Sequence, residues 1–168
     1  AAYGAAQAGR DYHTVDISER TLRDVYLPPF KAAVDEGVAT FMTSFNEYDG
    51  VPASGSKFLL TDVLRDEWGF DGFVVTDYTS INEMVPHGYA KDLEQAGEQA
   101  LNAGVDMDMQ GAVFMENMVK SVEEGRVSQA NIDRAVRRVL EMKYRLGLFE
   151  DPYRYADEAR QDATLYKP

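Results

Sequence analysis

Residues 68–78 read WGFDGFVVTDY, and this stretch decides the fold prediction. Gly69 ends a helical pattern, because glycine readily adopts the left-handed conformation that closes helices. The short apolar run Phe73–Val75 is typical of a buried parallel strand. Asp77 follows at the carboxyl end of that run, and Tyr78 comes directly after it. Strand ends of this kind hold the catalytic groups of (β/α) barrels, so Asp77 is a candidate catalytic carboxylate.

The order of strand and helix repeats along the chain. Short runs at 38–45, 73–75 and 105–109 predict strands, and a helical pattern follows each of them. Strands that recur roughly every 30 residues with a helix between them predict parallel α/β structure with right-handed crossovers. A complete barrel needs about 250 residues and eight strands. The predicted fold is therefore α/β, a partial (β/α)8 TIM-type barrel that comprises its C-terminal strands and helices.

Capping residues and apolar periodicity predict the remaining elements. Ser18 is expected to cap a helix, and this helix is expected to break at Pro28-Pro29. Further helices are expected at 30–36, 57–67, 92–103, 113–124 and 129–146. Four segments are expected to lack regular structure: 1–17, 46–52, 76–91 and 153–168.

The composition restricts partners and cofactors. With 29 Asp and Glu against 17 Lys and Arg, the net charge is -12, which disfavours nucleic acid and membrane surfaces because both attract basic patches. The chain has no Cys, and neither His13 nor His87 has a second ligand at a suitable spacing, so we expect no metal and no cofactor. The chain begins at Ala1 without an initiator Met, and we expect either a removed leader or a longer polypeptide.

Two longer segments carry a resemblance to a known family. One reads MTSFNEYDGVPA at 42–53, and the other reads LTDVLRDEWGFDGFVVTDY at 60–78. The opening AAYGAA at 1–6 and the closing KYRLGLF at 143–149 match as well. Together, in this order, they resemble glycoside hydrolase family 3, and within it the periplasmic β-glucosidases of Gram-negative bacteria. The resemblance covers essentially the whole chain.

The resemblance implies a retaining exo-β-glucosidase, periplasmic or secreted, that hydrolyses terminal β-D-glucosyl residues and uses Asp77 as its nucleophile. In the family, a substrate-binding Lys-His segment would precede Ala1, and the general acid/base Glu lies in a second domain. We therefore expect residues 1–150 to be the C-terminal part of the barrel domain and 151–168 to be a polar linker toward that second domain. The expected partners are a β-glucoside or oligosaccharide substrate and the remainder of the same polypeptide.

Four further residues are expected to bind substrate. Tyr78 follows the nucleophile, where an aromatic ring is able to stack on a sugar face. Arg10 resembles a position at which the family uses a cation to bind sugar hydroxyls, and a guanidinium offers five donors. Met42 and Phe45 line the end of the preceding strand. Many relatives carry Tyr in place of Phe45; a Tyr hydroxyl can donate to the nucleophile, and Phe cannot.

Structural roles stay open for the same residues. Asp77 is also placed to cap the next helical turn. Tyr78 is also placed to pack on the barrel rim, and Arg10 to pair at the surface with Asp11 or Asp16.

Asp106 and Asp108 stand at alternating positions at the end of the last predicted strand. Alternation puts both side chains on one face, where they are placed to form an acid pair with Asp77 or half of a cation site. We expect structural roles for both, with Asp106 the nearer to the site.

Two alternative functions remain open. The chain is compatible with a non-catalytic part-barrel module that binds sugar or only completes a larger assembly. It is also compatible with a β-xyloside as substrate. By itself the chain is expected to hydrolyse glucosides very poorly, because a general acid contributes about 10²–10⁴-fold to the rate.

Overall fold

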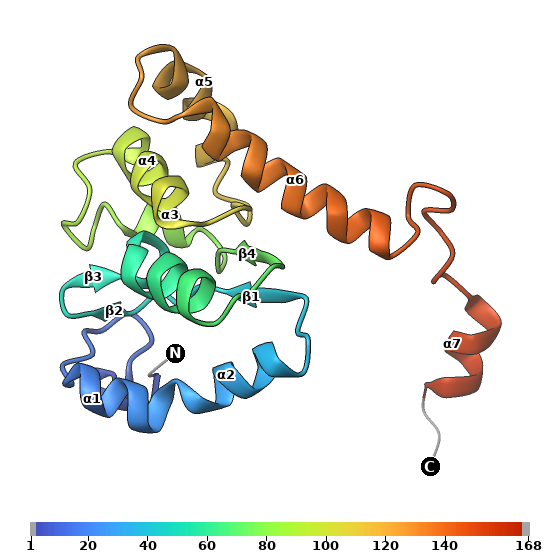
Figure 1. Ribbon diagram of the computed structural model, residues 1–168, viewed down its shortest axis with the longest axis horizontal. Coiled ribbons are helices and arrows are strands. Elements are labelled where there is room, and N and C mark those ends of the chain that lie inside the picture. Colours follow the sequence, from blue (N-terminus) through green and yellow to red (C-terminus); the bar gives the residue numbers. More distant parts are fainter. Residues whose placement is uncertain (1–2, 166–168) are drawn as a thin grey trace.

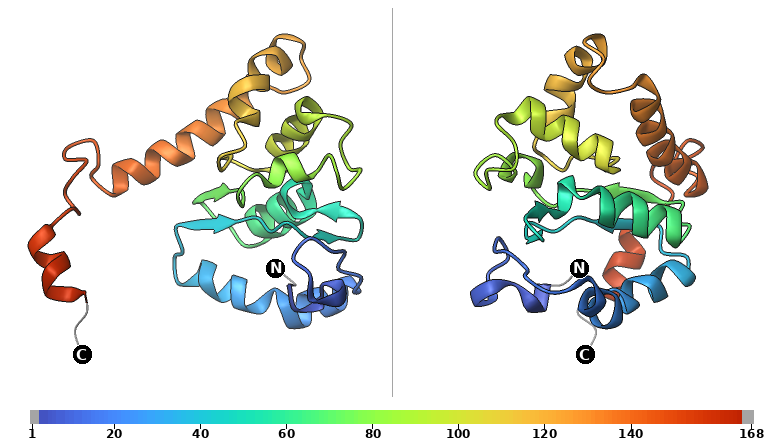
Figure 2. Two further views of the ribbon diagram at one scale, coloured as in Figure 1. Left: turned by 180° about the vertical axis from the view of Figure 1, so that it is seen from behind. Right: turned by 60° about the vertical axis from the view of Figure 1, so that its left-hand side comes forward.

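The computed structural model describes residues 3–165 and shows short strands covered by helices (Figures 1 and 2). The strands are β1 (Thr40–Met42), β2 (Glu47–Tyr48), β3 (Val51–Pro52) and β4 (Phe73–Val75). The α-helices are α1 (Glu19–Thr21), α2 (Pro28–Asp35), α3 (Ser80–Glu83), α4 (Leu93–Ala103), α5 (Val113–Glu123), α6 (Gln129–Arg145) and α7 (Glu158–Thr164). Tighter turns form η1 (Tyr3–Ala5), η2 (Gln7–Gly9) and η4 (Ala53–Gly55), and π-type helices form η3 (Leu22–Tyr26) and η5 (Phe58–Glu67). Helix α6 leads away from the strands toward α7, which stands apart from the body in Figure 1 and in the left view of Figure 2.

Parallel pairing organises the sheet. Strand β1 pairs with β4, with Met42 opposite Val75, and Val75 forms a further parallel bridge with Met107. Beyond the strands, the Thr43 amide still donates to the Val75 carbonyl at 3.0 Å. The strand predicted at 105–109 is thus reduced to a single bridge, because the amides of Asp106 and Met107 both donate to the one carbonyl of Val74. Three parallel chain segments nevertheless lie side by side, and the described residues close no barrel.

The expected interruption at Pro28-Pro29 is confirmed, since η3 ends at Tyr26 and a new helix, α2, begins at Pro28. Leu27 keeps helical dihedral angles of -81° and -29°, and the two prolines occupy the first turn of α2. Proline is favoured there because the missing N–H has no partner inside the helix. The expected cap at Ser18 is confirmed, since its Oγ accepts a hydrogen bond from the Thr21 amide at 3.1 Å.

All four segments expected to lack regular structure contain short elements, and those in 1–17 are η1 and η2. Between β2 and β3, Asp49 and Gly50 form a two-residue turn with φ of 53° and 76°, the geometry that suits a tight hairpin. Helix α3 lies within 76–91, and α7 lies within the polar tail, where all its described side chains are exposed. The role of 151–168 as a linker stays a prediction.

Three clusters of buried apolar side chains form the core. The first surrounds β4 and α4 and contains Leu60, Leu64, Phe70, Val74, Ile81, Met84, Ala90, Ala96, Ala100, Ala103, Val105 and Val113. The second lies beneath the N-terminal segment and contains Ala6, Val15, Leu22, Leu27 and Val63. The third joins α4, α5 and α6 through Leu101, Met118, Val127 and Ala135. Because β4 runs through the first cluster, burial fixes the strand that precedes Asp77.

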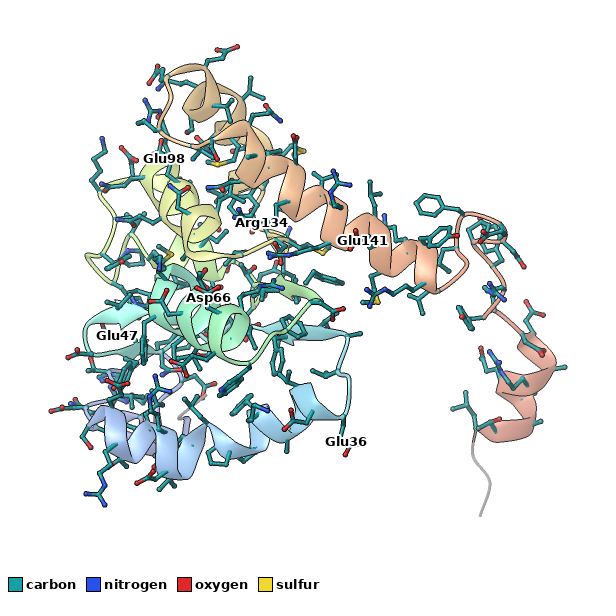
Figure 3. The ribbon with its side chains drawn as sticks, viewed as in Figure 1. Glu36, Glu47, Asp66, Glu98, Arg134 and Glu141 are labelled. Atoms are coloured by element: carbon teal, nitrogen blue, oxygen red, sulfur yellow. The ribbon has the colours of Figure 1, made fainter. Side chains whose placement is uncertain are left out.

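The negative charge is spread over the surface. The exposed acids Glu36, Asp66 and Glu141, labelled in Figure 3, come from the end of α2, from η5 and from α6. Within residues 3–165, no helix combines the length and the apolar character that crossing a membrane requires.

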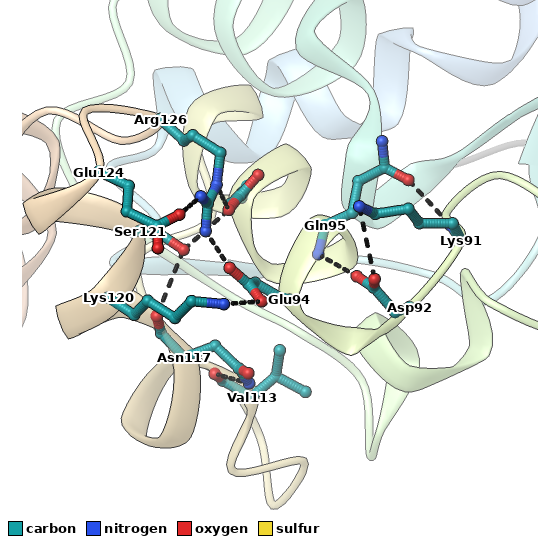
Figure 4. A network of polar contacts seen from close by, with 11 residues as sticks. Lys91, Asp92, Glu94, Gln95, Val113, Asn117, Lys120, Ser121, Glu124 and Arg126 are labelled. Carbon is teal, nitrogen blue, oxygen red and sulfur yellow. Dashed lines mark hydrogen bonds and ion pairs between the residues drawn. The ribbon is translucent and has the colours of Figure 1, made fainter.

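Arg126 is the centre of an ion network that ties α4 to the end of α5 (Figure 4). Its guanidinium pairs with Glu94, Glu98 and Glu124, and the Nε–Oε1 distance to Glu98 is 2.5 Å. Lys120 Nζ donates to Glu94 at 2.9 Å. The hydrogen bond with Glu98 raises the pKa of Arg126, and the hydrogen bond from Lys120 lowers the pKa of Glu94 below its ordinary 4.5.

We expect Arg126→Gln to destabilise the protein most at neutral pH. A carboxylate with a lowered folded-state pKa stabilises the fold above its unfolded-state pKa, and this contribution is lost as the pH falls through the folded-state value. The difference in Tm from the wild type is therefore expected to be large near pH 7 and to shrink below about pH 4.5 as Glu94 is protonated. The control is Arg137→Gln, because in the described structure Arg137 is exposed and forms no ion pair. A Tm difference that does not change with pH contradicts the expectation.

Candidate active site

The carboxyl ends of three parallel segments meet at one edge. Met42, Val75 and Met107 lie in register across them, so the residues that follow each one emerge together. We call this edge the strand-end site and define it by residues 42–45, 76–78 and 108. Four predicted site residues, Met42, Phe45, Asp77 and Tyr78, lie within it.

Asp77 is held at the strand-end site by the turn after β4. Its Oδ1 accepts a hydrogen bond from the Tyr78 amide at 2.7 Å, and its carbonyl accepts one from the Ser80 amide at 3.1 Å. Across residues 3–165, its other carboxylate oxygen has neither a hydrogen bond nor an ion pair. The residue at the N-cap position of α3 is Thr79, so the alternative in which Asp77 caps this helix is wrong. One oxygen is oriented by an amide, and the other is unengaged.

The turn that carries Asp77 is also held by the segment after Met107. Thr76 is fully buried, and its Oγ1 accepts a hydrogen bond from the Met109 amide at 2.8 Å. The Thr79 amide in turn donates to the Met109 carbonyl at 3.0 Å. Thr79 adopts φ 58° and ψ 18°, a left-handed conformation that is an outlier for a β-branched residue. Strain of about 1–3 kcal/mol persists at such a residue only where its surroundings impose it.

Two large side chains stand open around Asp77. Met42, the last residue of β1, and Tyr78, in the turn after β4, are each 56% exposed. The Tyr78 ring is thus more exposed than the alternative of packing on the barrel rim implies. Both side chains are available to a ligand at this edge.

The N-terminal loop that carries Arg10 contacts the strand-end site through Tyr12. The rings of Tyr12 and Phe45 contact each other with centroids 4.8 Å apart, and the Val15 amide donates to the Glu47 carbonyl at 2.7 Å. These contacts bring the N-terminal loop beside the chain after β1. Arg10 itself is exposed, and its Nη1 lies 3.4 Å from His13 Nε2.

The two roles considered for Arg10 are a surface ion pair and sugar binding, and its contacts bear on both. Over the described ranges, Arg10 forms no ion pair with Asp11 or Asp16, and it has no hydrogen bond to Asp77. A hollow of about 480 Å³ lies over Gly9–His13 and includes Arg10 among its lining residues. Its guanidinium donors are therefore accessible, although the structure does not bring them to Asp77.

Asp106 faces the interior. Its Oδ2 accepts from Arg65 Nη2 at 2.7 Å and from the Val74 amide at 2.9 Å, and its Oδ1 accepts from Arg138 Nη1 at 2.8 Å. Burial lowers the pKa of Arg65 to about 10, and the charge of Asp106 opposes that shift. Arg65 also donates to the Gly72 carbonyl at 2.6 Å. The structural role expected for Asp106 is confirmed, but its expected place nearer the site is wrong.

Asp108 is the acid that lies at the strand-end site. Its Oδ2 accepts hydrogen bonds from the amides of Val113 and Phe114 at 2.7 and 3.4 Å, so it holds the start of α5. Asp108 thus has a structural role too. In the part of the chain that the structure describes, no three His, Cys, Asp or Glu side chains gather into a metal-binding group.

A larger groove of about 1010 Å³ lies between α5 and α6, and its lining includes Met107, Asp108, Phe114, Met118 and Val136. Asp77 is not among its lining residues. The groove is mostly apolar, and its carboxylates are Asp106 and Asp108, which hold structural partners, and Glu123 of α5. The strand-end site, rather than this groove, holds the groups that are suited to chemistry.

Sequence reasoning missed a buried group of hydroxyls beneath the turn. Ser54 Oγ lies 2.7 Å from both Thr43 Oγ1 and Ser80 Oγ. It also missed Tyr12 as the partner of Phe45. No local pattern marks these residues, because the three hydroxyls come from separate segments.

A family model described as the glycosyl hydrolase family 3 N terminal domain matches residues 1–142. The chain belongs to glycosyl hydrolase family 3. The family resemblance read from the sequence is thereby confirmed.

Family 3 relatives match nearly the whole chain. It is 44% identical over 162 residues to a periplasmic beta-glucosidase of Salmonella typhimurium, covering 96% of the chain and 21% of that protein. It is 38% identical over 163 residues to a putative beta-xylosidase of Formosa agariphila, covering 96% of the chain and 22% of that protein. The chain therefore spans about a fifth of the length of these curated relatives.

A solved family 3 structure matches the fold. The crystal structure of a beta-glucosidase from Listeria innocua in complex with glucose has a TM-score of 0.94 and 42% identity, covering 99% of this chain and 23% of that one. The first domain of family 3 beta-glucosidases is a TIM-type barrel. The predicted fold class, a partial (β/α)8 barrel, is confirmed.

Proposed function

We propose that this chain is the nucleophile-bearing part of a retaining exo-β-glucosidase that hydrolyses terminal β-D-glucosyl residues. One observation carries the proposal: Asp77 stands at the carboxyl end of β4, with Oδ1 held by the Tyr78 amide and its other oxygen unengaged. A nucleophilic carboxylate needs this combination of fixed direction and a free lone pair. Membership of family 3 supports the same role.

In the proposed reaction, the free oxygen of Asp77 forms a bond to the anomeric carbon as the bond to the leaving oxygen breaks. A carboxylic acid protonates that leaving oxygen, and a covalent glycosyl–Asp77 ester results. The proton donor, now a carboxylate, takes a proton from water as the water attacks the anomeric carbon and displaces Asp77. The sugar is released with its configuration retained, and Asp77 is free again.

The proton donor is proposed to come from elsewhere in a longer polypeptide. A retaining enzyme needs its second carboxyl group about 5–5.5 Å from the first. Asp106 is engaged by two arginines, and Asp108 holds the start of α5. The coverage of about a fifth of the relatives supports this reading. Residues 1–150 then serve as the C-terminal part of the barrel domain and 151–168 as the linker.

Four residues are proposed to bind the sugar around Asp77. The exposed Tyr78 ring stacks on the pyranose face. Met42 and Phe45 form the apolar wall on the β1 side, with Phe45 supported by Tyr12. Arg10 donates to sugar hydroxyls from the N-terminal loop. The similarity to a periplasmic relative supports a periplasmic or secreted location.

A β-xyloside is the second candidate substrate, because a putative beta-xylosidase of Formosa agariphila is 38% identical to the chain. A xyloside lacks the hydroxymethyl group of a glucoside. Comparison of kcat/KM for nitrophenyl β-glucoside and nitrophenyl β-xyloside decides between them. A higher value for the xyloside contradicts the glucosidase assignment but leaves the proposed role of Asp77 as nucleophile unchanged.

Mechanism-based labelling tests the role of Asp77. The full-length polypeptide that carries this chain is incubated with 2-deoxy-2-fluoro-β-glucosyl fluoride, digested and mapped by mass spectrometry. We expect a 2-fluoroglucosyl adduct on Asp77, because the fluorine slows hydrolysis of the covalent intermediate. Turnover of glucosides with the adduct on another carboxylate contradicts the proposal. A folded full-length protein that binds glucose without turnover favours the non-catalytic module.

A further inference from the structure

Three buried hydroxyls meet beneath the turn that carries Asp77. The oxygens of Thr43 and Ser54 are 2.7 Å apart, those of Ser54 and Ser80 are 2.7 Å apart, and those of Thr43 and Ser80 are 3.4 Å apart. The three residues are only 1% to 4% exposed, so bulk water does not replace a missing member. Each hydroxyl supplies one donor and accepts in turn, so the three satisfy one another. We call this group the hydroxyl cluster.

The hydroxyl cluster ties together the chain on both sides of the nucleophile. Thr43 follows β1, and its amide donates to the Val75 carbonyl at 3.0 Å, just before Asp77. Ser80 begins α3, and its amide donates to the Asp77 carbonyl at 3.1 Å. Ser54 lies in η4 and joins the two. The backbone of Asp77 is thus fixed from the strand side and from the helix side through one buried group.

The segment between these anchors is strained. Thr79 has φ 58°, and its Oγ1 donates to the Tyr78 carbonyl at 2.6 Å. Without an anchor at Ser80, the favoured dihedral angles of a threonine would reorient the Tyr78–Thr79 peptide. That peptide directly follows the Tyr78 amide that holds Asp77 Oδ1 at 2.7 Å. The anchor therefore maintains the geometry that points the carboxylate.

We propose that Thr43, Ser54 and Ser80 are positioning residues that hold the strained turn 77–80 and so aim Asp77 at the anomeric carbon. This inference rests on the proposed nucleophilic role of Asp77. The hydroxyl cluster touches no substrate; it acts on the direction of attack. Misplacement of a reacting group by about 1 Å costs about 10²-fold in rate.

The test is Ser80→Ala in the full-length polypeptide, with labelling by 2-deoxy-2-fluoro-β-glucosyl fluoride followed over time. We expect the first-order rate constant of inactivation to fall by about 10- to 100-fold. The inhibitor concentration that gives half of the maximal rate is expected to stay within about two-fold, because ground-state binding does not depend on the aim of Asp77. If Ser80 had a purely structural role, Ser80→Ala would lower Tm and would not lower the inactivation rate constant independently of the half-maximal inhibitor concentration.

The matched control is Ser121→Ala. Ser121 is a fully buried serine in α5, and its Oγ donates to Glu98 Oε1 at 2.8 Å. Within residues 3–165, Ser121 Oγ forms no hydrogen bond with a residue of the turn 77–80. We expect a lower Tm and an unchanged inactivation rate constant. If Ser121→Ala slows inactivation as much as Ser80→Ala does, general destabilisation explains both results and the inference is overturned.

Thr79→Gly provides a second variant whose stability does not limit the test. Glycine adopts positive φ without strain, so Tm is expected to equal or exceed that of the wild type. Because glycine keeps the turn without an anchor, Ser80→Ala is expected to slow inactivation less in the Thr79→Gly background than in the wild type. If the wild type is labelled at Asp77 and a folded Ser80→Ala variant keeps the wild-type rate constant, the positioning role alone is overturned. Absence of wild-type labelling at Asp77 overturns the proposed function itself.

Discussion

Asp77→Ala in the full-length polypeptide is expected to lower kcat/KM for nitrophenyl β-glucoside by roughly 10⁴-fold or more, as removal of an enzymatic nucleophile does. Without the carboxylate, no covalent intermediate forms, and the remaining groups only bind the sugar. The Kd for glucose is expected to change little, because Oδ1 of Asp77 is engaged with the Tyr78 amide rather than with a binding side chain. Steady-state kinetics and calorimetric glucose titration measure the two quantities.

Asp71→Ala is the matched control for this variant. Asp71 precedes the same strand at its other end, and within residues 3–165 its carboxylate forms one exposed pair, with Arg145 at 3.3 Å. Its loss is expected to leave kcat/KM within about two-fold, because exposed pairs contribute little. A value for Asp77→Ala that stays within tenfold of the wild type is incompatible with a nucleophilic role.

The second large effect is expected from Asp106→Ala, in stability rather than in catalysis. The side chains of Asp106 and Arg65 are 1% and 8% exposed, so removal of the carboxylate leaves a buried guanidinium without its counter-ion. Breaking a buried pair from one side costs about 3–5 kcal/mol in the free energy of unfolding. The loss is expected as a large fall in Tm, or as insoluble protein.

Asp106→Asn separates the charge from the hydrogen bonds. Its amide oxygen still accepts from the Val74 amide, whose bond to Asp106 Oδ2 is 2.9 Å in the native chain. We expect a loss smaller than that of alanine but larger than the cost of Asp71→Ala, which is at most about 1 kcal/mol. Thermal unfolding of the three variants ranks them. Equal Tm values for Asp106→Ala and Asp71→Ala would show that the buried pair does not stabilise the fold.

Local signals in the sequence predicted the elements that depend on local chemistry. The strand Phe73–Val75 matches its prediction to the residue, because Gly69 and Gly72 interrupt the chain before this apolar run and polar residues follow it. The Ser18 cap follows from a side-chain oxygen, and the helix predicted at 92–103 ends as expected, before Gly104 with its φ of 117°. Asp49 and Gly50 form the turn of a hairpin in 46–52, a segment expected from its sequence to lack regular structure.

The parts that the sequence did not reveal depend on distant partners. The oxygens of the hydroxyl cluster come from residues 11, 26 and 37 positions apart. Asp106 finds Arg65 41 positions earlier and Arg138 32 positions later, so its alternation with Asp108 gave no hint of an interior role. The left-handed Thr79 has no sequence signal, because threonine disfavours that conformation and only tertiary contacts impose it.

The link between Asp106 and α6 sets an order of events during synthesis. A nascent chain is made and leaves the ribosome from its N-terminus, so Asp106 and its earlier partner Arg65 are synthesised before Arg138. Until α6 emerges, Asp106 Oδ1 lacks the donor that it has in the finished fold at 2.8 Å. The last parallel segment therefore acquires its full set of contacts only after α6 has been made, and a ribosome that pauses before residue 138 holds a chain in which Asp106 Oδ1 still lacks its arginine partner.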